Sequence, residues 1–243
     1  MKVWGTTDTG LVRKENQDAF SVETVGHYTV AVVCDGMGGT NGGQLASTIA
    51  VKTFMDGLKQ YLRENMSLKQ WEATASACIS LANTTIRSEA AIHREYENMG
   101  TTLVSAIVKG NQAVISNIGD SRAYIVNGEE IRQITKDHSI VENMVERGDL
   151  TKEEARRHPS RNLITRALGP DAVAEADHYT VELEPKDYLL LCSDGLVNTV
   201  SDQEILFEII HSDKVDTCLS RLMAVSKDRG APDNVTAVLL CNE

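Results

Sequence analysis

Long apolar runs are missing from this sequence. The first ten residues hold no apolar stretch behind a basic segment. No later run approaches the roughly 18 uncharged apolar residues that a membrane-spanning helix needs. The 243 residues are 42% hydrophobic, which is enough for one large core. We therefore expect a single domain over residues 1–243, a soluble cytoplasmic protein and no membrane partner.

Metal-binding patterns of cysteine and histidine are also missing. The five cysteines are scattered, odd in number and form no Cys-x-x-Cys pair, so they indicate neither a disulfide framework nor a zinc site. The six histidines show no His-x-x-x-His spacing. We expect reduced, mostly buried thiols and histidines that are structural or lie at the surface.

Basic residues are few relative to acidic ones. Lys and Arg number 24 against 35 Asp and Glu, which gives a net charge of -11. This balance works against a broad surface for the phosphate backbone of nucleic acid, so we expect no nucleic-acid partner. The excess of acid can serve solubility or can hold divalent cations, and the placement of the carboxylates decides between these two interpretations.

The first part of the chain has one strand pattern followed by two helix patterns. Residues 27–34 are apolar and β-branched and stop at an Asp-Gly pair, which predicts a buried strand running into a turn. After a glycine-rich stretch, apolar residues at near-helical spacing predict a helix over 44–62. Ser67 and Gln70 have the spacing of a capping box, which predicts a second helix reaching about Tyr96.

The later part of the chain is dominated by strand patterns. From Thr101, short β-branched runs separated by turn residues predict an antiparallel meander to about Thr135. A more polar segment at about 138–169, with a cap at Thr151 and Glu154, interrupts the strands, and we interpret it as a mobile flap. Further patterns predict strands at 188–192 and 234–241, and helices at 201–211 and 215–227. Two groups of helices around antiparallel strands predict an α+β fold in which two antiparallel sheets form a sandwich with α-β-β-α layers.

Three aspartates stand where predicted buried strands meet loops. Asp35 follows VAVVC, Asp194 follows LLLCS, and Asp233 directly precedes NVTAVLL. Any one of them could be a turn residue, because Asp-Gly is a common turn dipeptide, and Asp56 in a helical pattern illustrates that case. Together they favour a cation site, since a buried carboxylate without a cation or hydrogen-bond donors is costly to ionise. Oxygen-only donors favour Mg²⁺ or Mn²⁺ over zinc.

Six blocks of sequence run nearly end to end along the chain: RKENQDAF, VVCDGMGGTNGG, MGTTLVSAIV, NIGDSRAYIV, LLCSDGLVNTVSDQEI and DNVTAVLL. In sequence and in order they resemble the metal-dependent protein phosphatases, the type 2C or PPM family, in its compact bacterial form. The resemblance implies a single phosphatase catalytic domain with a flap subdomain at about 138–169. It implies hydrolysis of phosphoserine and phosphothreonine by a metal-bridged water or hydroxide, as a signalling enzyme opposing a Ser/Thr kinase. We expect a monomer acting on phosphorylated proteins, including that kinase and its substrates.

The resemblance also implies metal ligands. Asp35 would bridge two Mn²⁺ or Mg²⁺ ions, the backbone carbonyl of Gly36 would complete one of them, and Asp194 with Asp233 would hold the other. Asp120, in the GDSR block, resembles a residue that helps bind a third ion together with the counterpart of Asp194. From the residues alone, Asp120 could instead form only the turn between two strands.

Two residues match family positions next to the metals. Arg13 matches the arginine that grips phosphate, a role suited to a planar guanidinium that can hold two phosphate oxygens. Asp18 matches an acid that supports metal-bound water from outside the ligand set, although it could instead cap a turn.

Two further positions depart from the family pattern. Gln17 stands where many relatives have an acid, and Met37 stands where many eukaryotic members have a histidine proposed as general acid. We therefore expect a metal-bound water to protonate the leaving alkoxide. The competing interpretation gives that role to His138 or His158.

Three other classes of function are weighed against this one. A cysteine phosphatase using Cys34 or Cys192 lacks the amide-rich, positive loop that a reactive thiolate needs. A catalytically inactive scaffold on the same fold would be favoured by loss of a metal aspartate, and all are present. A two-metal phosphodiesterase or nuclease is disfavoured by the net charge.

Overall fold

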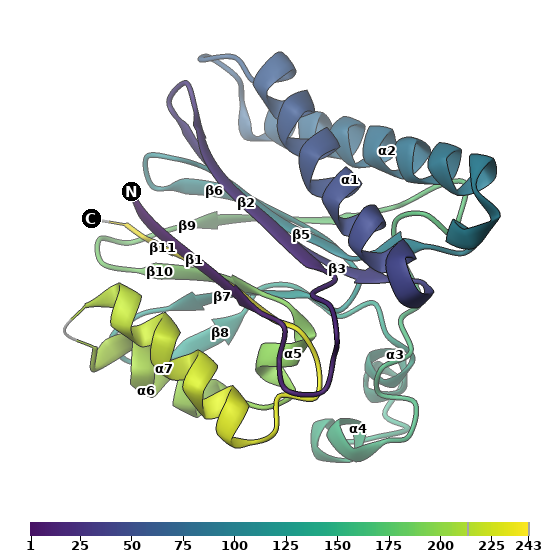
Figure 1. The fold of residues 1–243 in the computed structure, drawn as a ribbon. Coiled ribbons are helices and arrows are strands. Elements are labelled where there is room, and N and C mark those ends of the chain that lie inside the picture. Colours follow the sequence, from purple (N-terminus) through teal and green to yellow (C-terminus); the bar gives the residue numbers. More distant parts are fainter. Residues whose placement is uncertain (213, 243) are drawn as a thin grey trace.

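Two antiparallel sheets lie face to face at the centre of the structure, a computed structural model that describes residues 1–212 and 214–242 (Figure 1). The five-stranded sheet has the order β1 (Lys2–Asp8), β11 (Val235–Cys241), β10 (Tyr188–Cys192), β7 (Arg122–Val126) and β8 (Ile131–Gln133). The six-stranded sheet has the order β2 (Asp18–Val25), β3 (Tyr28–Met37), β5 (Leu103–Lys109), β6 (Gln112–Ile118) and β9 (Asp177–Glu182), with β4 (Gly100–Thr101) paired to β3.

Helices cover the outer face of each sheet. The six-stranded sheet carries α1 (Gly39–Tyr61) and α2 (Leu68–Ile92), and the five-stranded sheet carries α6 (Asp202–Ile210) and α7 (Val215–Asp228) (Figure 1). The sandwich with α-β-β-α layers that the sequence predicts is thereby confirmed. Among the described helices, none is long and apolar enough to cross a bilayer.

Strand alternation divides the core into three layers. Successive side chains of a strand point to opposite faces of the sheet. In β3, Val32 packs against the helices while Ala31 and Val33 pack between the two sheets. In β10, Leu190 packs against α6 and α7 while Leu189 packs between the sheets. Each central strand is therefore apolar on both faces, which is why these segments appear in the sequence as continuous hydrophobic runs.

The helix starts marked by capping boxes agree with the structure, whereas the first helix begins at Gly39, earlier than the predicted residue 44, because its first turn lies in the glycine-rich stretch. Capping boxes form at Ser67 with Gln70, at Thr151 with Glu154 and at Ser201 with Glu204. The second helix ends at Ile92, short of the expected Tyr96, and a 3₁₀ turn at Arg94–Tyr96 follows it.

The predicted meander from Thr101 to Thr135 is correct for the antiparallel pairs β5 with β6 and β7 with β8, but wrong for the connection from β6 to β7. Strand β6 pairs with β5 and β9, whereas β7 pairs with β10 and β8, so the chain leaves one sheet and enters the other between Ile118 and Arg122. Both strands are buried along almost their whole length, and a strand apolar on both faces carries no sign of which sheet it joins. The crossing places Asp120 between the two sheets.

Strands β1 and β2 were not predicted from the sequence. Their burial is mixed and does not alternate cleanly, because they are edge strands of the two sheets. A one-turn helix, α5 (Asp194–Val197), occupies the position where the sequence suggested a simple turn.

The segment 138–169 contains two short helices, α3 (Ile140–Glu146) and α4 (Lys152–Arg157). Bridges between Ser139 and Ile164 and between Thr101 and Leu168 close the segment at its base. Figure 1 shows both helices at one end of the sandwich, beside the loops that join the strands. The segment therefore lies at the same end of the molecule as the candidate site.

Replacing Leu190 by Ala should destabilise the fold strongly. Its side chain is fully buried between β10 and the helices, so the substitution leaves a cavity that costs roughly 2–5 kcal/mol. Urea denaturation measures this loss. Leu81→Ala is the control, because that leucine is 47% exposed and should change the unfolding free energy by about 0.5 kcal/mol or less. Equal effects of the two substitutions would contradict the layered core.

Candidate active site

Loops at one end of both sheets bring four aspartates to one pocket. The pocket has a volume of about 480 Å³ and is lined by Asp35, Asp120, Asp194 and Asp233. Asp35 lies near the end of β3, Asp120 in the crossing from β6 to β7, Asp194 after β10 and Asp233 before β11. Strand ends that meet at one edge thus join residues that are far apart in the chain. The three acids that the residues alone nominated share this pocket with Asp120.

The backbone of Asp35 is held by two threonines. The amide of Asp35 donates to Thr102 Oγ1 at 2.9 Å, and the carbonyl of Asp35 accepts from Thr102 N and Thr101 Oγ1, each at 2.8 Å. Thr102 Oγ1 also lies 2.7 Å from the hydroxyl of Ser121 in the crossing loop. Sequence analysis missed these threonines, although the MGTT block contains them. They fix the position of Asp35 relative to the loop that carries Asp120.

Gly36 stands where any side chain would collide with the backbone. A Cβ at this position would lie 2.0 Å from the carbonyl oxygen of Gly43 and 2.7 Å from that of Gln17. The amide of Gly36 donates to the same Gln17 carbonyl at 3.2 Å. Only glycine fits this close approach, which keeps the Gly36 backbone at the pocket wall.

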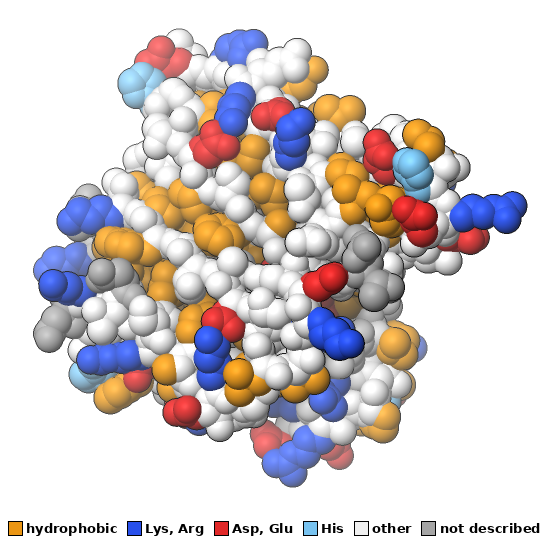
Figure 2. Space-filling view, viewed as in Figure 1, with side chains coloured by type: hydrophobic (Ala, Val, Ile, Leu, Met, Phe, Trp, Pro, Cys, Tyr) orange, Lys and Arg blue, Asp and Glu red, His pale blue; other side chains and the backbone are white. Residues whose placement is uncertain are grey.

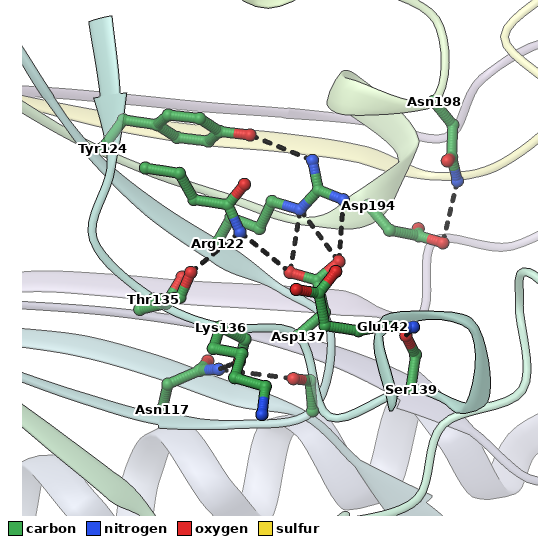
Figure 3. A network of polar contacts seen from close by, with 12 residues as sticks. Asn117, Arg122, Tyr124, Thr135, Lys136, Asp137, Ser139, Glu142, Asp194 and Asn198 are labelled. Carbon is green, nitrogen blue, oxygen red and sulfur yellow. Dashed lines mark hydrogen bonds and ion pairs between the residues drawn. The ribbon is translucent and has the colours of Figure 1, made fainter. Parts of the chain in front are cut away.

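Asp194 has one satisfied oxygen and one orphaned oxygen. Its Oδ2 accepts from Asn198 Nδ2 at 2.9 Å, as Figure 3 shows. Its Oδ1 is buried, and no group in the part of the chain that the structure describes donates a hydrogen bond to it. In the same view, the Arg122 guanidinium is bound by the Asp137 carboxylate, with the shortest contact at 2.7 Å. Burial raises the pKa of Asp194, and the side-chain hydrogen bonds with Asp35 and Asn198, followed by the positive charge of Arg122, partly offset this effect.

Asp18 shows the same asymmetry below the pocket. It is opposite Asp35 in the register of β2 and β3. Its Oδ2 accepts from the hydroxyls of Ser193 and Thr236, each at 2.7 Å, while its Oδ1 is buried without a donor. The alternative that Asp18 only caps a turn does not hold, because its partners come from the ends of two strands in the other sheet.

Burial and mutual repulsion shape the electrostatics of this group. Burial raises the pKa of Asp35 and of Asp120 well above the ordinary value, and the charges of neighbouring aspartates raise it further. Burial also raises the pKa of Asp194, as does the charge of Asp233. Asp18 reaches a pKa of about 6, because burial outweighs its two hydroxyl donors. A positive charge in the pocket would lower all of these pKa values.

Arg13 provides a positive charge inside the pocket. Its Nη2 donates to Asp233 Oδ2 at 2.7 Å, and this hydrogen bond raises the pKa of Arg13. The loop carrying Arg13 is held by Asn234, whose Nδ2 donates to the carbonyls of Thr9 and Glu15. Asn234 was not among the predicted site residues, although it stands in the DNV block directly after Asp233. It fixes the arginine loop to the start of β11.

The two positions that depart from the family pattern also line the pocket. The amide nitrogen Nε2 of Gln17 donates to the carbonyl of Gly39 at 2.9 Å, a bond that a carboxylate could not make. Met37 presents a thioether, which cannot deliver a proton. Neither His138 nor His158 lines the pocket, and His138 is buried. The position of both imidazoles argues against their acting on a substrate there.

The residues present fit hard divalent cations by their donor chemistry. Within residues 1–212 and 214–242, no three His, Cys, Asp or Glu side chains close around a single point. The Asp233 carboxylate turns instead to Arg13. Nevertheless, the donors are all oxygens, and a buried Oδ1 on Asp194 has no other partner. Such oxygens are the ligands that Mg²⁺ and Mn²⁺ prefer.

Most of the chain matches one known protein family. The family model described as Protein phosphatase 2C covers residues 12–239, which include all the pocket aspartates. The chain belongs to the protein phosphatase 2C family. Phosphatases of this family are metal-dependent, in agreement with the oxygen donors gathered here.

Several members of the protein phosphatase 2C family resemble this chain over its whole length. Serine/threonine phosphatase stp of Listeria monocytogenes is 36% identical over 240 residues, covering 96% of this chain and 93% of that protein. Protein phosphatase PhpP of Streptococcus pneumoniae is 36% identical, covering 99% of this chain and 97% of that protein. The solved structure of Stp1 from Staphylococcus aureus has a TM-score of 0.92 at 37% identity and covers 100% of this chain and 95% of that one.

Chelated protein should lose stability as the pH rises from about 4 to about 6. The unfolded chain releases the Asp18 proton near the ordinary pKa of 3.8, whereas the folded protein keeps it to about 6. Stability that is fully present below pH 3.8 is therefore lost as the pH rises through the folded pKa. Asp18→Asn should remove this part of the loss, on the order of 1–3 kcal/mol.

Urea denaturation between pH 4 and 7 measures this effect. Asp56→Asn serves as the control, because Asp56 is exposed on α1 and its substitution should leave the slope of stability against pH as in the unaltered protein. An Asp18→Asn curve parallel to that of the unaltered protein would refute the raised pKa.

Proposed function

We propose that this chain is a protein serine/threonine phosphatase, a phosphoric monoester hydrolase that acts on phosphoserine and phosphothreonine in proteins. One observation carries the proposal. Four aspartates from distant strand ends share a pocket with Arg13, in a chain of the protein phosphatase 2C family. A phosphate monoester is a dianion that resists attack, so a catalyst has to neutralise its charge and supply a nucleophile at neutral pH.

Two Mn²⁺ or Mg²⁺ ions would be held by Asp35, the carbonyl of Gly36, Asp194 and Asp233, and a third by Asp120 with Asp194. The orphaned Oδ1 of Asp194 and the raised pKa values of these acids support this assignment. When bound, such ions neutralise phosphate charge and lower the pKa of water toward neutrality.

The chain's own groups would bind and orient the phosphate. Arg13 exchanges its bond to Asp233 for two phosphate oxygens, which a planar guanidinium can hold at once. Asp18, fixed by two hydroxyls, presents its free Oδ1 as an acceptor from outside the ligand set. Because no imidazole lines this pocket in the described residues, the leaving alkoxide takes its proton from water.

The proposal also covers domain organisation, oligomeric state, cellular compartment and substrate class. Residues 1–243 act as one catalytic domain, as a monomer that opposes a Ser/Thr kinase in cytoplasmic signalling. Five buried free thiols support a reducing compartment. On the face that Figure 2 shows, Lys and Arg side chains are interspersed with Asp and Glu rather than gathered in one field, which favours protein over nucleic-acid substrates.

Asp35→Asn and Asp233→Asn should each lower hydrolysis of p-nitrophenyl phosphate and of a phosphothreonine peptide by a hundredfold or more. Each removes a charged oxygen donor from the pocket. Even groups that only orient metal ligands, without touching the metal, commonly contribute about 10–100-fold to metal affinity or activity. Steady-state rates with Mn²⁺, with and without chelator, provide the measurement. An anomalous-scattering map after a Mn²⁺ soak counts the ions.

The controls separate this proposal from its rivals. Asp56→Asn, on the exposed face of α1, should keep full activity. Activity that survived chelator or the Asp35 substitution would remove the mechanism, and cleavage of diesters but not monoesters would support a nuclease. Absence of any hydrolysis by the unaltered protein would favour an inactive scaffold.

The flap at 138–169 is proposed to select substrates. Its Asn162 and Ile164 line the same pocket as Arg13, so a phosphorylated segment bound there lies within reach of the flap. A flexible segment beside a rigid site can vary without disturbing the chemistry.

Exchanging residues 140–164 for those of a relative should change the preference among phosphopeptides by about tenfold or more, while the rate on p-nitrophenyl phosphate changes little. The small ester has no flanking residues that the flap could select, whereas a phosphopeptide does. Competition between peptides of different flanking sequence gives the specificity constants. Equal changes on peptide and small ester would contradict a role in selection.

A further inference from the structure

His138 is a buried imidazole whose every polar group is engaged. Only 4% of its side chain is exposed, and it lies at the base of the flap rather than in the pocket. Its backbone carbonyl accepts from Thr165 N at 2.7 Å, which ties together the two strands of the flap base. Neither the metal ligands nor the phosphate-binding group includes it, so its role is not explained by the proposed chemistry.

His138 forms hydrogen bonds with both the backbone carbonyl and the backbone amide of Gly119. Its backbone amide donates to the Gly119 carbonyl at 2.9 Å, and its Nδ1 accepts from the Gly119 amide at 3.2 Å. Gly119 has φ of 107°, a conformation that side chains rarely adopt, at the point where the chain crosses from β6 to β7. The next residue is Asp120. The imidazole therefore holds the peptide before Gly119, and the backbone amide of His138 holds the peptide between Gly119 and Asp120, so that His138 fixes both sides of the residue next to Asp120.

The opposite side of the ring is fixed by a carboxylate. Since Nδ1 accepts a hydrogen bond, the neutral ring carries its proton on Nε2, which lies 3.1 Å from Asp177 Oδ2 and donates to it. Arg166 Nη1 donates to Asp177 Oδ1 at 3.0 Å and lies beside the ring at 3.3 Å. Burial lowers the pKa of His138, which keeps the ring neutral. The Asp177 carboxylate sets the tautomer of His138. Arg166 belongs to the segment that leads back from the flap into β9.

We infer that His138 is a positioning residue that holds Asp120 in place for the third cation and links that loop to the base of the flap. The inference rests on the proposed function, because it assumes that Asp120 binds a cation. It assigns to Asp177 the role of orienting the imidazole. Loss of the Nδ1 acceptor frees the amide of Gly119, while the backbone bond to its carbonyl remains, and the loosened turn then holds the Asp120 side chain less firmly. Partners that orient metal-binding groups commonly contribute 10–100-fold to metal affinity.

Two substitutions separate the two sides of the ring. His138→Asn can keep an acceptor near the position of Nδ1 but cannot reach Asp177. His138→Gln can keep a donor near the position of Nε2 but offers no acceptor to Gly119. His178→Asn is the control, since His178 is a half-buried histidine on β9 that is bonded to Ser76 and Ser116 and not to Gly119.

Hydrogen exchange in chelated protein gives the first measurement. The Gly119 amide should exchange roughly tenfold faster in His138→Gln than in the unaltered protein, and His138→Asn should lie between them. Titration calorimetry with Mn²⁺ gives the second: the weakest site should lose about 10–100-fold in affinity in His138→Gln, with the tighter sites retained. His178→Asn should match the unaltered protein in both measurements.

Each outcome decides the matter. Slow Gly119 exchange and intact Mn²⁺ binding in His138→Gln would overturn the inference, as would an equal loss in His178→Asn. If the unaltered protein bound Mn²⁺ but hydrolysed no phosphoester, the proposed function would fail while the positioning role stood. Weaker binding at every Mn²⁺ site in His138→Gln would show that His138 has a general structural role. That result would also overturn the inference.

Discussion

Repulsion among carboxylates that share a buried pocket is the constraint around which this structure is arranged. Asp18, Asp35, Asp120 and Asp194 all have raised pKa values because each is buried near other acids. Because these carboxylates repel one another, the surrounding structure has to be rigid to keep them in place. Strand ends, hydroxyl donors and the Arg13 bond to Asp233 supply that rigidity. The cost of crowding these charges is what makes the pocket selective for cations.

The support of the site is shared between the two sheets. Asp18 and Asp35 belong to the six-stranded sheet, whereas the hydroxyls that fix Asp18 come from Ser193 and Thr236 at strand ends of the other sheet. Thr102 and Ser121 join the two sheets in the same way on the opposite side of Asp35. The packing between the sheets therefore sets the spacing of the acids as well as the stability of the fold.

Sequence reasoning found the layers and the acids but not their supports. Continuous apolar runs indicated β3, β10 and β11, and capping boxes located three helix starts, because those signals are local. The crossing between β6 and β7 was misread as a hairpin, since both strands are buried on both faces. Thr102 and Asn234 were missed as site residues because their roles depend on contacts that no local pattern records. The family resemblance supplied Arg13 and Asp120, which residue patterns alone had not singled out.

The bond between Arg13 and Asp233 joins groups 220 residues apart, and Asn234 holds the arginine loop across a similar span. The edge strand β1 likewise pairs with β11. During synthesis, strands β2, β3, β5 and β6 and the two helices that cover them precede the rest of the fold, yet the pocket stays incomplete until the final strand has left the ribosome. A partly synthesised chain thus carries no finished catalytic centre, and premature truncation yields a protein that lacks the site rather than one with uncontrolled activity.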